Sequence, residues 1–258
     1  MIDNMKFLVA VKQVPDTTLI DVDENGNMKR EGVPSILDPY SEHALETALD
    51  LRREGDTVTV VTMGPPQAEA ALRRCLELGA DEAYLLSDRS FAGADVHATS
   101  RTLSAFIEKF ACDHSLFLFG KQAADGDTAQ VPAEVAEMLG RQQFCYCISI
   151  RSGGNGFTAV QDYGDEIRTC SVPEGSVVSV SEGAVNRGLP SIERFMQVRK
   201  MAVKTLDRIA LGLGNFSVGM NGSRTKIVRS VNVRSERIGK VTDGSDPVKA
   251  AEYIRGLL

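Results

Sequence analysis

The sequence has little of what many classes of enzyme require. Its 258 residues contain no tryptophan and only three histidines, His43, His97 and His114. None of these histidines stands in a Ser/His/Asp or H-E-x-x-H arrangement. We therefore assign no catalytic residue, and the sequence disfavours a hydrolase that carries its own catalytic groups.

Cysteines are also few. The five cysteines are Cys75, Cys112, Cys145, Cys147 and Cys170. Their spacing contains no C-x-x-C pair, and no histidine lies near enough in sequence to indicate a zinc site. Cys145 and Cys147 would face the same side of a regular strand, because side chains alternate along it. We expect buried free thiols and no metal centre.

Long hydrophobic segments are missing as well. No apolar run is long enough to span a bilayer. The segment Met1–Lys6 leads directly into an apolar strand without the apolar region of a signal peptide, so we expect a cytoplasmic protein. The hydrophobic share of 43% is that of an ordinary globular protein, and the length suffices for one large α/β domain or a domain with an extension.

The two best-known glycine-rich phosphate motifs, G-x-G-x-x-G and G-x-x-x-x-G-K-[ST], do not occur. A different phosphate signal lies in Ser115–Gly140. The apolar run Ser115–Phe119 is typical of a buried strand, and a small polar loop, Lys121–Asp127, follows it. A helical pattern then covers Thr128–Leu139.

The start of that helix is the expected binding element. Asp127 and Gln130 resemble a capping box, and Gly140 is a stop signal. Free N–H groups at a helix start, together with the helix dipole, bind phosphate well. We predict a site for a nucleotide diphosphate here; the alternative is a plain strand–helix connection that binds nothing.

Strands and helices alternate along the first part of the chain. The predicted strands are Met5–Val11, Thr57–Thr62, Ala83–Leu86 and Ser115–Phe119, and the predicted helices before the last of them are Pro39–Arg53, Gln67–Leu78 and Val96–Phe110. A hairpin is expected within Leu19–Glu31. This alternation predicts an α/β fold with a doubly wound, mostly parallel sheet, a Rossmann-like three-layer sandwich whose ligands bind beyond the carboxyl ends of the strands.

The pattern changes after Gly140. Turn-linked, hence antiparallel, strands are expected at Phe144–Ile150, Phe157–Tyr163 and Ile167–Ser171, and Ser176–Val180 is expected to return to the core. Beyond it the alternation is lost, apart from helices at Ser191–Lys200 and after Asp246-Pro247. We therefore predict a nucleotide-binding α/β domain over residues 1–186 and a partner-wrapping C-terminal arm with a terminal helix over residues 187–258.

Charge is distributed unevenly between these parts. Within Arg187–Lys240 we count twelve Lys and Arg against three acidic residues, a net charge of +9, so the remainder of the chain carries −6 − 9 = −15. A basic arm could contact nucleic acid, an acidic protein or its own body. Nucleic acid is the weakest candidate, because the arm has only two aromatic residues, Phe195 and Phe216, and no known binding motif.

Several of these segments resemble one known family, the beta subunits of electron-transfer flavoproteins. The resemblance covers almost the whole chain and is carried by Gly120–Gln130 (GKQAADGDTAQ), Val9–Thr17 (VAVKQVPDT), Gly64-Pro65 and Leu189-Pro190-Ser191. It implies that an adenine nucleotide binds at the ends of the strands, with the backbone of Asp125–Val131 on its diphosphate. The cofactor-binding residues that it implies are Ala10, Asp38, Met63, Asp95, Thr99, Asp125, Gly126, Asp127, Thr128, Ala129, Gln130 and Val131.

Two positions depart from the family pattern. Asp38 stands where the family usually has asparagine; an aspartate cannot donate a hydrogen bond, so it either contacts the nucleotide differently or only caps the following helix. Val96 stands where a threonine is usual in the bifurcating type, which Ser87–Thr99 otherwise resembles.

Leu189 has two interpretations. An apolar residue between glycine and proline usually packs on its own domain. In the family, the matching residue is an anchor that inserts into a partner dehydrogenase.

The resemblance implies the beta subunit of a bifurcating electron-transfer flavoprotein, an electron-transfer subunit that oxidises NADH only as part of a complex. FAD in this subunit would accept a hydride from NAD(H). Electrons would pass to ferredoxin or flavodoxin and, through the FAD of the alpha subunit, to an acyl-CoA dehydrogenase. The alternatives are a conventional beta subunit that holds AMP and a stand-alone adenine-nucleotide sensor, which would have no need for the extended arm.

Overall fold

The computed structural model describes residues 4–16, 34–153, 156–181, 189–226 and 246–256. The chain forms two compact units, Met1–Lys226 and Ile227–Leu258, and each is described by itself. The predicted hairpin within Leu19–Glu31 lies outside the described residues. None of the helices over the described residues combines the length and the apolar character of a membrane span.

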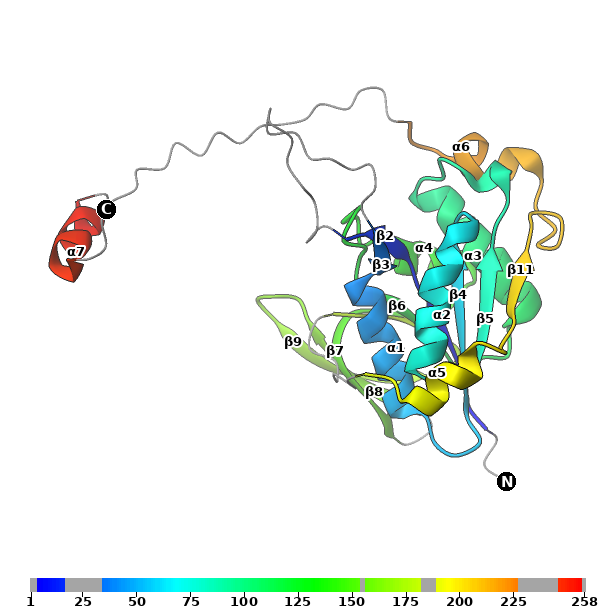
Figure 1. Cartoon of the computed structure of the whole chain (residues 1–258), viewed down its shortest axis with the longest axis horizontal. Coiled ribbons are helices and arrows are strands. Elements are labelled where there is room, and N and C mark those ends of the chain that lie inside the picture. The colour runs from blue at the N-terminus through cyan, green and yellow to red at the C-terminus, as the bar shows by residue number, and fades with distance from the viewer. Residues whose placement is uncertain (1–3, 17–33, 154–155, 182–188, 227–245, 257–258) are drawn as a thin grey trace. The chain divides into compact units, whose positions relative to one another are not determined.

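A nine-stranded sheet in the order β11-β5-β4-β1-β6-β10-β7-β8-β9 forms the centre of the first unit (Figure 1). The strands are β11 (Val203–Leu206), β5 (Glu82–Leu86), β4 (Thr57–Met63), β1 (Lys6–Ala10), β6 (Leu116–Gly120), β10 (Ser176–Val180), β7 (Gln143–Gly153), β8 (Gly156–Asp162) and β9 (Ile167–Pro173). Neighbours from β11 to β7 are parallel, and β7, β8 and β9 are antiparallel. The predicted mostly parallel sheet with an antiparallel addition is confirmed.

Helices cover both faces of the sheet because successive residues of each buried strand point to opposite sides. The helices of the βα units are α1 (Pro39–Leu51), α2 (Glu69–Leu78), α3 (Val96–Phe110) and α4 (Val131–Met138). One core joins Phe7 and Val9 of β1 to apolar residues of α1 and α2, and a second core joins Leu8 to α3 and α4. The fold is thus a three-layer, doubly wound sandwich.

A small second sheet follows β1. It pairs β2 (Gln13–Pro15) with β3 (Ser35–Leu37) in antiparallel register. The sequence analysis did not predict these short strands. They hold the exit of β1 beside the start of α1.

Residues after 186 belong in large part to the first unit, so the predicted boundary at 186/187 does not coincide with the division in the structure. Helix α5 (Ile192–Val198) docks on the end of α2 through Arg194. The Nε of Arg194 donates to the carbonyl of Leu76 over 2.8 Å, and its Nη2 donates to the carbonyl of Ala80. Strand β11, which was not predicted, extends the sheet, and Lys204 there pairs with Glu82 at 2.7 Å.

The segment after β11 also packs on this unit. It contains the short helices η4 (Asn215–Ser217) and α6 (Gly219–Gly222). Asp88, which caps the 3-10 turn η3 (Arg89–Phe91), accepts a bond from the N–H of Arg208, and the N–H of Met220 donates to Ala92. Part of the basic arm therefore contacts the chain's own body, one of the three possibilities that its charge left open.

The second unit contains α7 (Pro247–Arg255). Asp246 caps it by accepting bonds from the N–H groups of Val248 and Lys249. The predicted helix after Asp246-Pro247 is confirmed.

All five cysteines are free, but they are not all buried. Cys75 and Cys147 are buried, Cys145 and Cys170 are half-buried, and Cys112 is exposed, so the expectation was wrong for Cys112. Tyr146, between Cys145 and Cys147, has a φ of +60°, which interrupts the regular alternation assumed for that pair.

Candidate nucleotide-binding site

The loop between β6 and α4 begins at a close contact between backbones. A Cβ atom on Gly120 would lie 2.7 Å from the carbonyl carbon of Tyr40, so the last residue of β6 must be glycine for α1 to approach. Gln122 then donates to the Tyr40 hydroxyl over 3.3 Å. The start of the loop is thereby fixed against the start of α1.

The end of the loop differs from the prediction. Helix α4 begins at Val131 with Gln130 at the N-cap and no side-chain cap bond, so the predicted capping box of Asp127 and Gln130 is wrong. Asp127 and Ala129 have φ angles of +53° and +55°, and these left-handed residues turn the chain before the helix starts. Pro132 in the first turn and Gly140 (φ +60°) after the end of the helix agree with the prediction.

These left-handed residues leave backbone donors free. The N–H groups of Thr128, Ala129 and Gln130 donate to no other described residue. Successive N–H groups in a turn that alternates between left- and right-handed conformations form a concave anion site. Left-handed backbone at residues other than glycine is costly and is concentrated at functional sites. The loop can thus hold a phosphate by its backbone.

Gly126 is not one of the strained positions. Its φ is not positive, and a Cβ atom there would meet only the Lys12 Nζ, at 4.0 Å. The backbone strain lies instead at Asp127 and Ala129.

Asp38 is completely buried and serves as the N-cap of α1. Its Oδ2 accepts bonds from the N–H and the hydroxyl of Ser41 at 2.9 and 3.0 Å, and its Oδ1 accepts the N–H of Ala124 at 2.9 Å. The carboxylate therefore caps α1 and also links it to the phosphate-binding loop.

Lys12, which the sequence analysis did not single out, holds the loop at Asp125. Its Nζ pairs with Asp125 Oδ1 at 2.6 Å. Nothing in the sequence other than its place in the VKQVPDT segment points to this role, since 113 residues separate the partners. Lys12 thus places a cation next to the loop from the exit of β1.

The start of α3 lies across from the loop. Asp95 is the N-cap: its Oδ1 accepts the N–H of Ala98, and its Oδ2 accepts the N–H groups of Arg224 and Thr225 and the Thr225 hydroxyl. Partial burial opposes ionisation of Asp95, but these hydrogen bonds outweigh it and lower its pKa to about 2. The carboxylate fixes residues 224–225 at the helix start.

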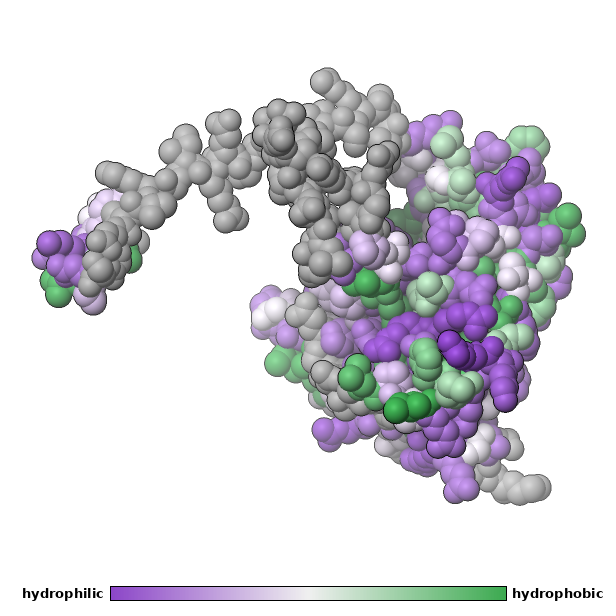
Figure 2. Space-filling model, in the orientation of Figure 1, coloured by the Kyte–Doolittle hydropathy of each residue, from purple (hydrophilic) through white to green (hydrophobic). Residues whose placement is uncertain are grey.

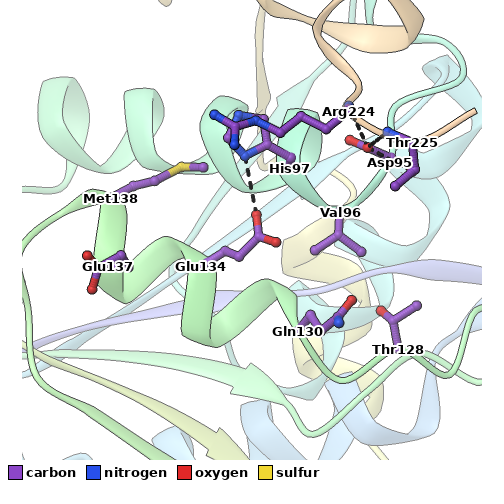
Figure 3. Close-up of a pocket in the computed structure, with 10 residues that line it drawn as sticks. All are labelled: Asp95, Val96, His97, Thr128, Gln130, Glu134, Glu137, Met138, Arg224 and Thr225. Carbon is purple, nitrogen blue, oxygen red and sulfur yellow. Dashed lines mark hydrogen bonds and ion pairs between the residues drawn. The ribbon is translucent and has the colours of Figure 1, made fainter.

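A cavity of about 650 Å³ separates the two helix starts (Figure 3). It brings together the predicted residues Asp95, Thr128 and Gln130. The complete lining is Asp95, Val96, His97, Thr128, Gln130, Glu134, Glu137, Met138, Arg224 and Thr225. The predicted convergence of the α3 and α4 starts on one cleft is therefore present, and its volume suits a cofactor.

Charges of both signs line this cavity. Nδ1 of His97 lies 3.6 Å from Glu134 Oε2 across it, as the dashed line in Figure 3 shows. Arg224 comes from the segment held by Asp95. The sequence analysis missed His97, Glu134 and Arg224 as cavity residues. The packing of α3 against α4 brings His97 to Glu134, and the bonds to Asp95 bring the segment of Arg224.

The remaining predicted residues do not line the cavity. Thr99 lies in the first turn of α3, and its N–H donates to the Asp95 carbonyl. Ala10 and Met63 end the neighbouring strands β1 and β4 and are partly buried against the second core. Asp125, Gly126, Asp127 and Val131 lie in the loop or at the start of α4.

Leu189 lies at the opposite edge of the sheet. Helix α5 docks on the end of α2, which precedes the amino end of β5. Leu189 is 90% exposed, so it does not pack on its own domain. Ile192, Phe195 and Met196 of α5 are exposed with it, and Figure 2 shows hydrophobic side chains over this part of the face.

Comparison with known proteins decides the family. The electron transfer flavoprotein domain matches residues 26–211, more than half of the chain. The chain belongs to the electron transfer flavoprotein family. Its relatives place it among the beta subunits of that family, as the resemblance predicted.

These relatives match over nearly their whole length. The electron transfer flavoprotein subunit beta of Thermoanaerobacterium thermosaccharolyticum is 42% identical over 93% of each chain. The caffeyl-CoA reductase-Etf complex subunit CarD of Acetobacterium woodii is 38% identical over 93% of each. Protein FixA of Azotobacter vinelandii is 39% identical over 96% of this chain and 92% of the relative.

Membership gives a coarse function directly. The chain is a flavoprotein-family subunit with a role in electron transport, together with an alpha-type subunit. No cluster of three or more His, Cys, Asp or Glu side chains suited to a metal ion occurs in the part of the chain that the structure describes.

Proposed function

We propose that this electron transfer flavoprotein beta subunit binds FAD at the cavity between α3 and α4, and that the bound flavin accepts a hydride from NADH and divides its electrons between two acceptors. One is ferredoxin or flavodoxin. The other is the FAD of the alpha subunit, which passes electrons to an acyl-CoA dehydrogenase. That CarD is named as a subunit of a reductase–Etf complex supports the last step.

The single observation that carries the proposal is the convergence of two helix starts on one cavity. An AMP has one phosphate and would need one such start. A flavin diphosphate beside a nicotinamide diphosphate would use both. The free N–H groups of Thr128, Ala129 and Gln130 fit one of these anions.

The cavity carboxylates are compatible with an anionic ligand. The oxygens of Asp95 already accept bonds from the N–H groups of Ala98, Arg224 and Thr225. Glu134 faces His97, and Arg224 adds a positive charge to the lining.

The chain's residues bind and orient in this function. The loop after β6 holds phosphate, and Asp38 and Lys12 hold the loop. No residue is assigned as acid or base, since electron transfer needs the cofactor placed and its potential tuned. The exposed Leu189 is the anchor that we assign to the dehydrogenase.

The alternative within the family is a conventional subunit with AMP in the same loop. The strained turn at Asp127 and Ala129 would serve either ligand. AMP, with one phosphate, would not contact the start of α3.

The test is to purify this chain together with its alpha subunit and to quantify the FAD and AMP released on denaturation. We expect two FAD per heterodimer and direct bleaching of the flavin absorbance by NADH. One FAD and one AMP, in a complex inert to NADH, would contradict the proposal and support the conventional subunit.

A further inference from the structure

We infer that Arg224 holds the second phosphate of the ligand in the cavity between α3 and α4, and that this chain thereby binds a diphosphate in preference to a monophosphate. The inference deepens the proposed function and rests on it in one respect, that a nucleotide binds at the loop after β6. It assigns a ligand contact to a segment that lies far along the chain from every predicted cofactor-binding residue.

The backbone on both sides of the Arg224 side chain is fixed. Asp95 Oδ2 accepts the N–H of Arg224 at 2.8 Å, together with the N–H and the hydroxyl of Thr225 at 2.8 and 2.9 Å. The hydroxyl of Ser223 accepts the N–H of Asp95 at 2.9 Å and donates to the carbonyl of Gly219 at 2.8 Å. These bonds hold residues 223–225 at the start of α3 without using the guanidinium of Arg224.

That guanidinium is available to a ligand. Figure 3 shows the Arg224 side chain extending from its backbone beside Asp95 toward His97, along the cavity that it lines. Glu134 and Glu137 belong to the same lining, but the guanidinium makes no hydrogen bond or ion pair with any residue that the structure describes. Arg224 is also the one Lys or Arg side chain among the described residues of the lining.

The start of α3 supplies backbone donors beside this cation. The N–H groups of Val96 and His97 donate to no other described residue, whereas Asp95 accepts the N–H of Ala98. Free N–H groups in the first turn of a helix and the helix dipole attract an anion. The planar guanidinium can form two parallel bonds to phosphate oxygens. One phosphate at the loop 128–130 and a second on the α3 side would thus both be held within one cavity.

The two phosphates should therefore respond differently to the loss of Arg224. A monophosphate at the loop 128–130 would not reach the guanidinium, and a diphosphate would. Hydrogen bonds between charged groups are the strong kind, but Arg224 is exposed, and solvent screens part of the attraction, so we expect a loss of about fivefold to tenfold in affinity for a diphosphate.

The experiment compares Arg224→Gln and Arg224→Lys with the control Arg101→Gln in the complex with the alpha subunit, after bound nucleotide has been dialysed out. Arg101 is an exposed residue of α3 outside the cavity lining, so the control removes the same charge away from the site. AMP and ADP are titrated calorimetrically at low and at high ionic strength, and thermal unfolding shows that each variant is folded.

Arg224→Gln should weaken ADP binding by about fivefold or more at low ionic strength and leave AMP binding within about twofold. The loss should shrink as salt is added, because salt screens an exposed charge. Arg224→Lys should lose less than Arg224→Gln, because it keeps the charge without the fork. Arg101→Gln should bind both nucleotides as the wild type does.

Wild-type affinity for ADP in Arg224→Gln would overturn the inference. So would equal losses for AMP and ADP that do not depend on salt, because the substitution would then disturb the segment rather than a phosphate contact. A complex that releases FAD in place of AMP on denaturation, yet binds ADP normally after Arg224→Gln, would leave the proposed function intact and refute the inference alone. A wild-type complex that binds neither nucleotide would refute the proposed site and the inference together.

Discussion

The strained turn before α4 allows a sharp test of the site. Ala129 has a φ of +55° in the present structure. A left-handed conformation costs a residue with a Cβ atom about 1–2 kcal/mol, and a β-branched residue more. The change Ala129→Val therefore penalises this turn without altering charge.

The magnitude follows from that cost. If the branched side chain adds about 1–2 kcal/mol, the competent turn becomes about 5- to 30-fold rarer, since each 1.4 kcal/mol corresponds to a factor of ten. The apparent dissociation constant rises by the same factor. Ala129→Gly should retain the affinity of the native chain, because glycine adopts a positive φ freely.

Gly126 supplies the matched control, three residues earlier in the same loop. Its φ is not positive, and an added Cβ atom would make only a contact at 4.0 Å with Lys12. Gly126→Ala should therefore change affinity by less than about twofold.

The assay is the nucleotide content of the purified complex and the affinity for AMP and ADP by calorimetry, with thermal unfolding to show that each variant is folded. Ala129→Gly should bind nucleotide at least as tightly as the wild type, and Ala129→Val should bind much more weakly than the wild type. Full nucleotide content in Ala129→Val would refute the proposal that this turn binds phosphate. A large loss of affinity in Gly126→Ala would show that Gly126, rather than Ala129, is the sensitive position.

Three further results are expected. The loss in free energy of unfolding caused by Asp95→Asn should be largest above the ordinary pKa of 3.8 and should shrink as the pH falls toward 2. The reason is that the bonds to Asp95 lower its pKa to about 2 in the folded state. Urea titrations between about pH 2 and 6 measure this loss, and a loss that does not depend on pH would contradict the prediction. Iodoacetamide should modify the exposed Cys112 first, because burial raises the pKa of Cys147 to about 12 and also raises the pKa of Cys75. Peptide mass spectrometry measures the order of modification, and modification of Cys75 or Cys147 before Cys112 would contradict this prediction. A chain that ends at Lys226 should unfold at nearly the native temperature but lose binding to the alpha subunit. A chain that ends at residue 186 should be destabilised, because it lacks α5 and β11. Full affinity of the shortened chains for the alpha subunit would show that the arm has another purpose.

The sequence alone determined the layers of the fold. Continuous apolar runs such as Leu116–Phe119 predict buried parallel strands, and helix signals as local as Asp95 before Val96 place the start of α3 at the observed residue. Such patterns are local, because burial and capping are governed by residues a few positions apart. The motifs at Val9–Thr17, Gly64-Pro65, Gly120–Gln130 and Leu189-Pro190-Ser191 then predicted the family.

Local patterns failed where distant residues decide the conformation. Asp127 and Gln130 have the spacing of a capping box, yet the helix starts at Val131, after the loop has been fixed by Asp38 and Lys12. Strand β11 is four residues long and is specified by its pairing with β5 rather than by its own pattern.

Tertiary structure also decided which charges remain free. The net charge of the arm did not reveal that the charged groups of Arg194 and Lys204 are occupied by the chain's own body. Nor did the sequence reveal that Asp38 holds the loop after β6, because a hydrogen bond between residues 86 positions apart leaves no periodic signal. From the sequence, the segments that can bind a phosphate are visible only as separate local elements. Their convergence on one cavity depends on the packing of α3 against α4 across a shared core.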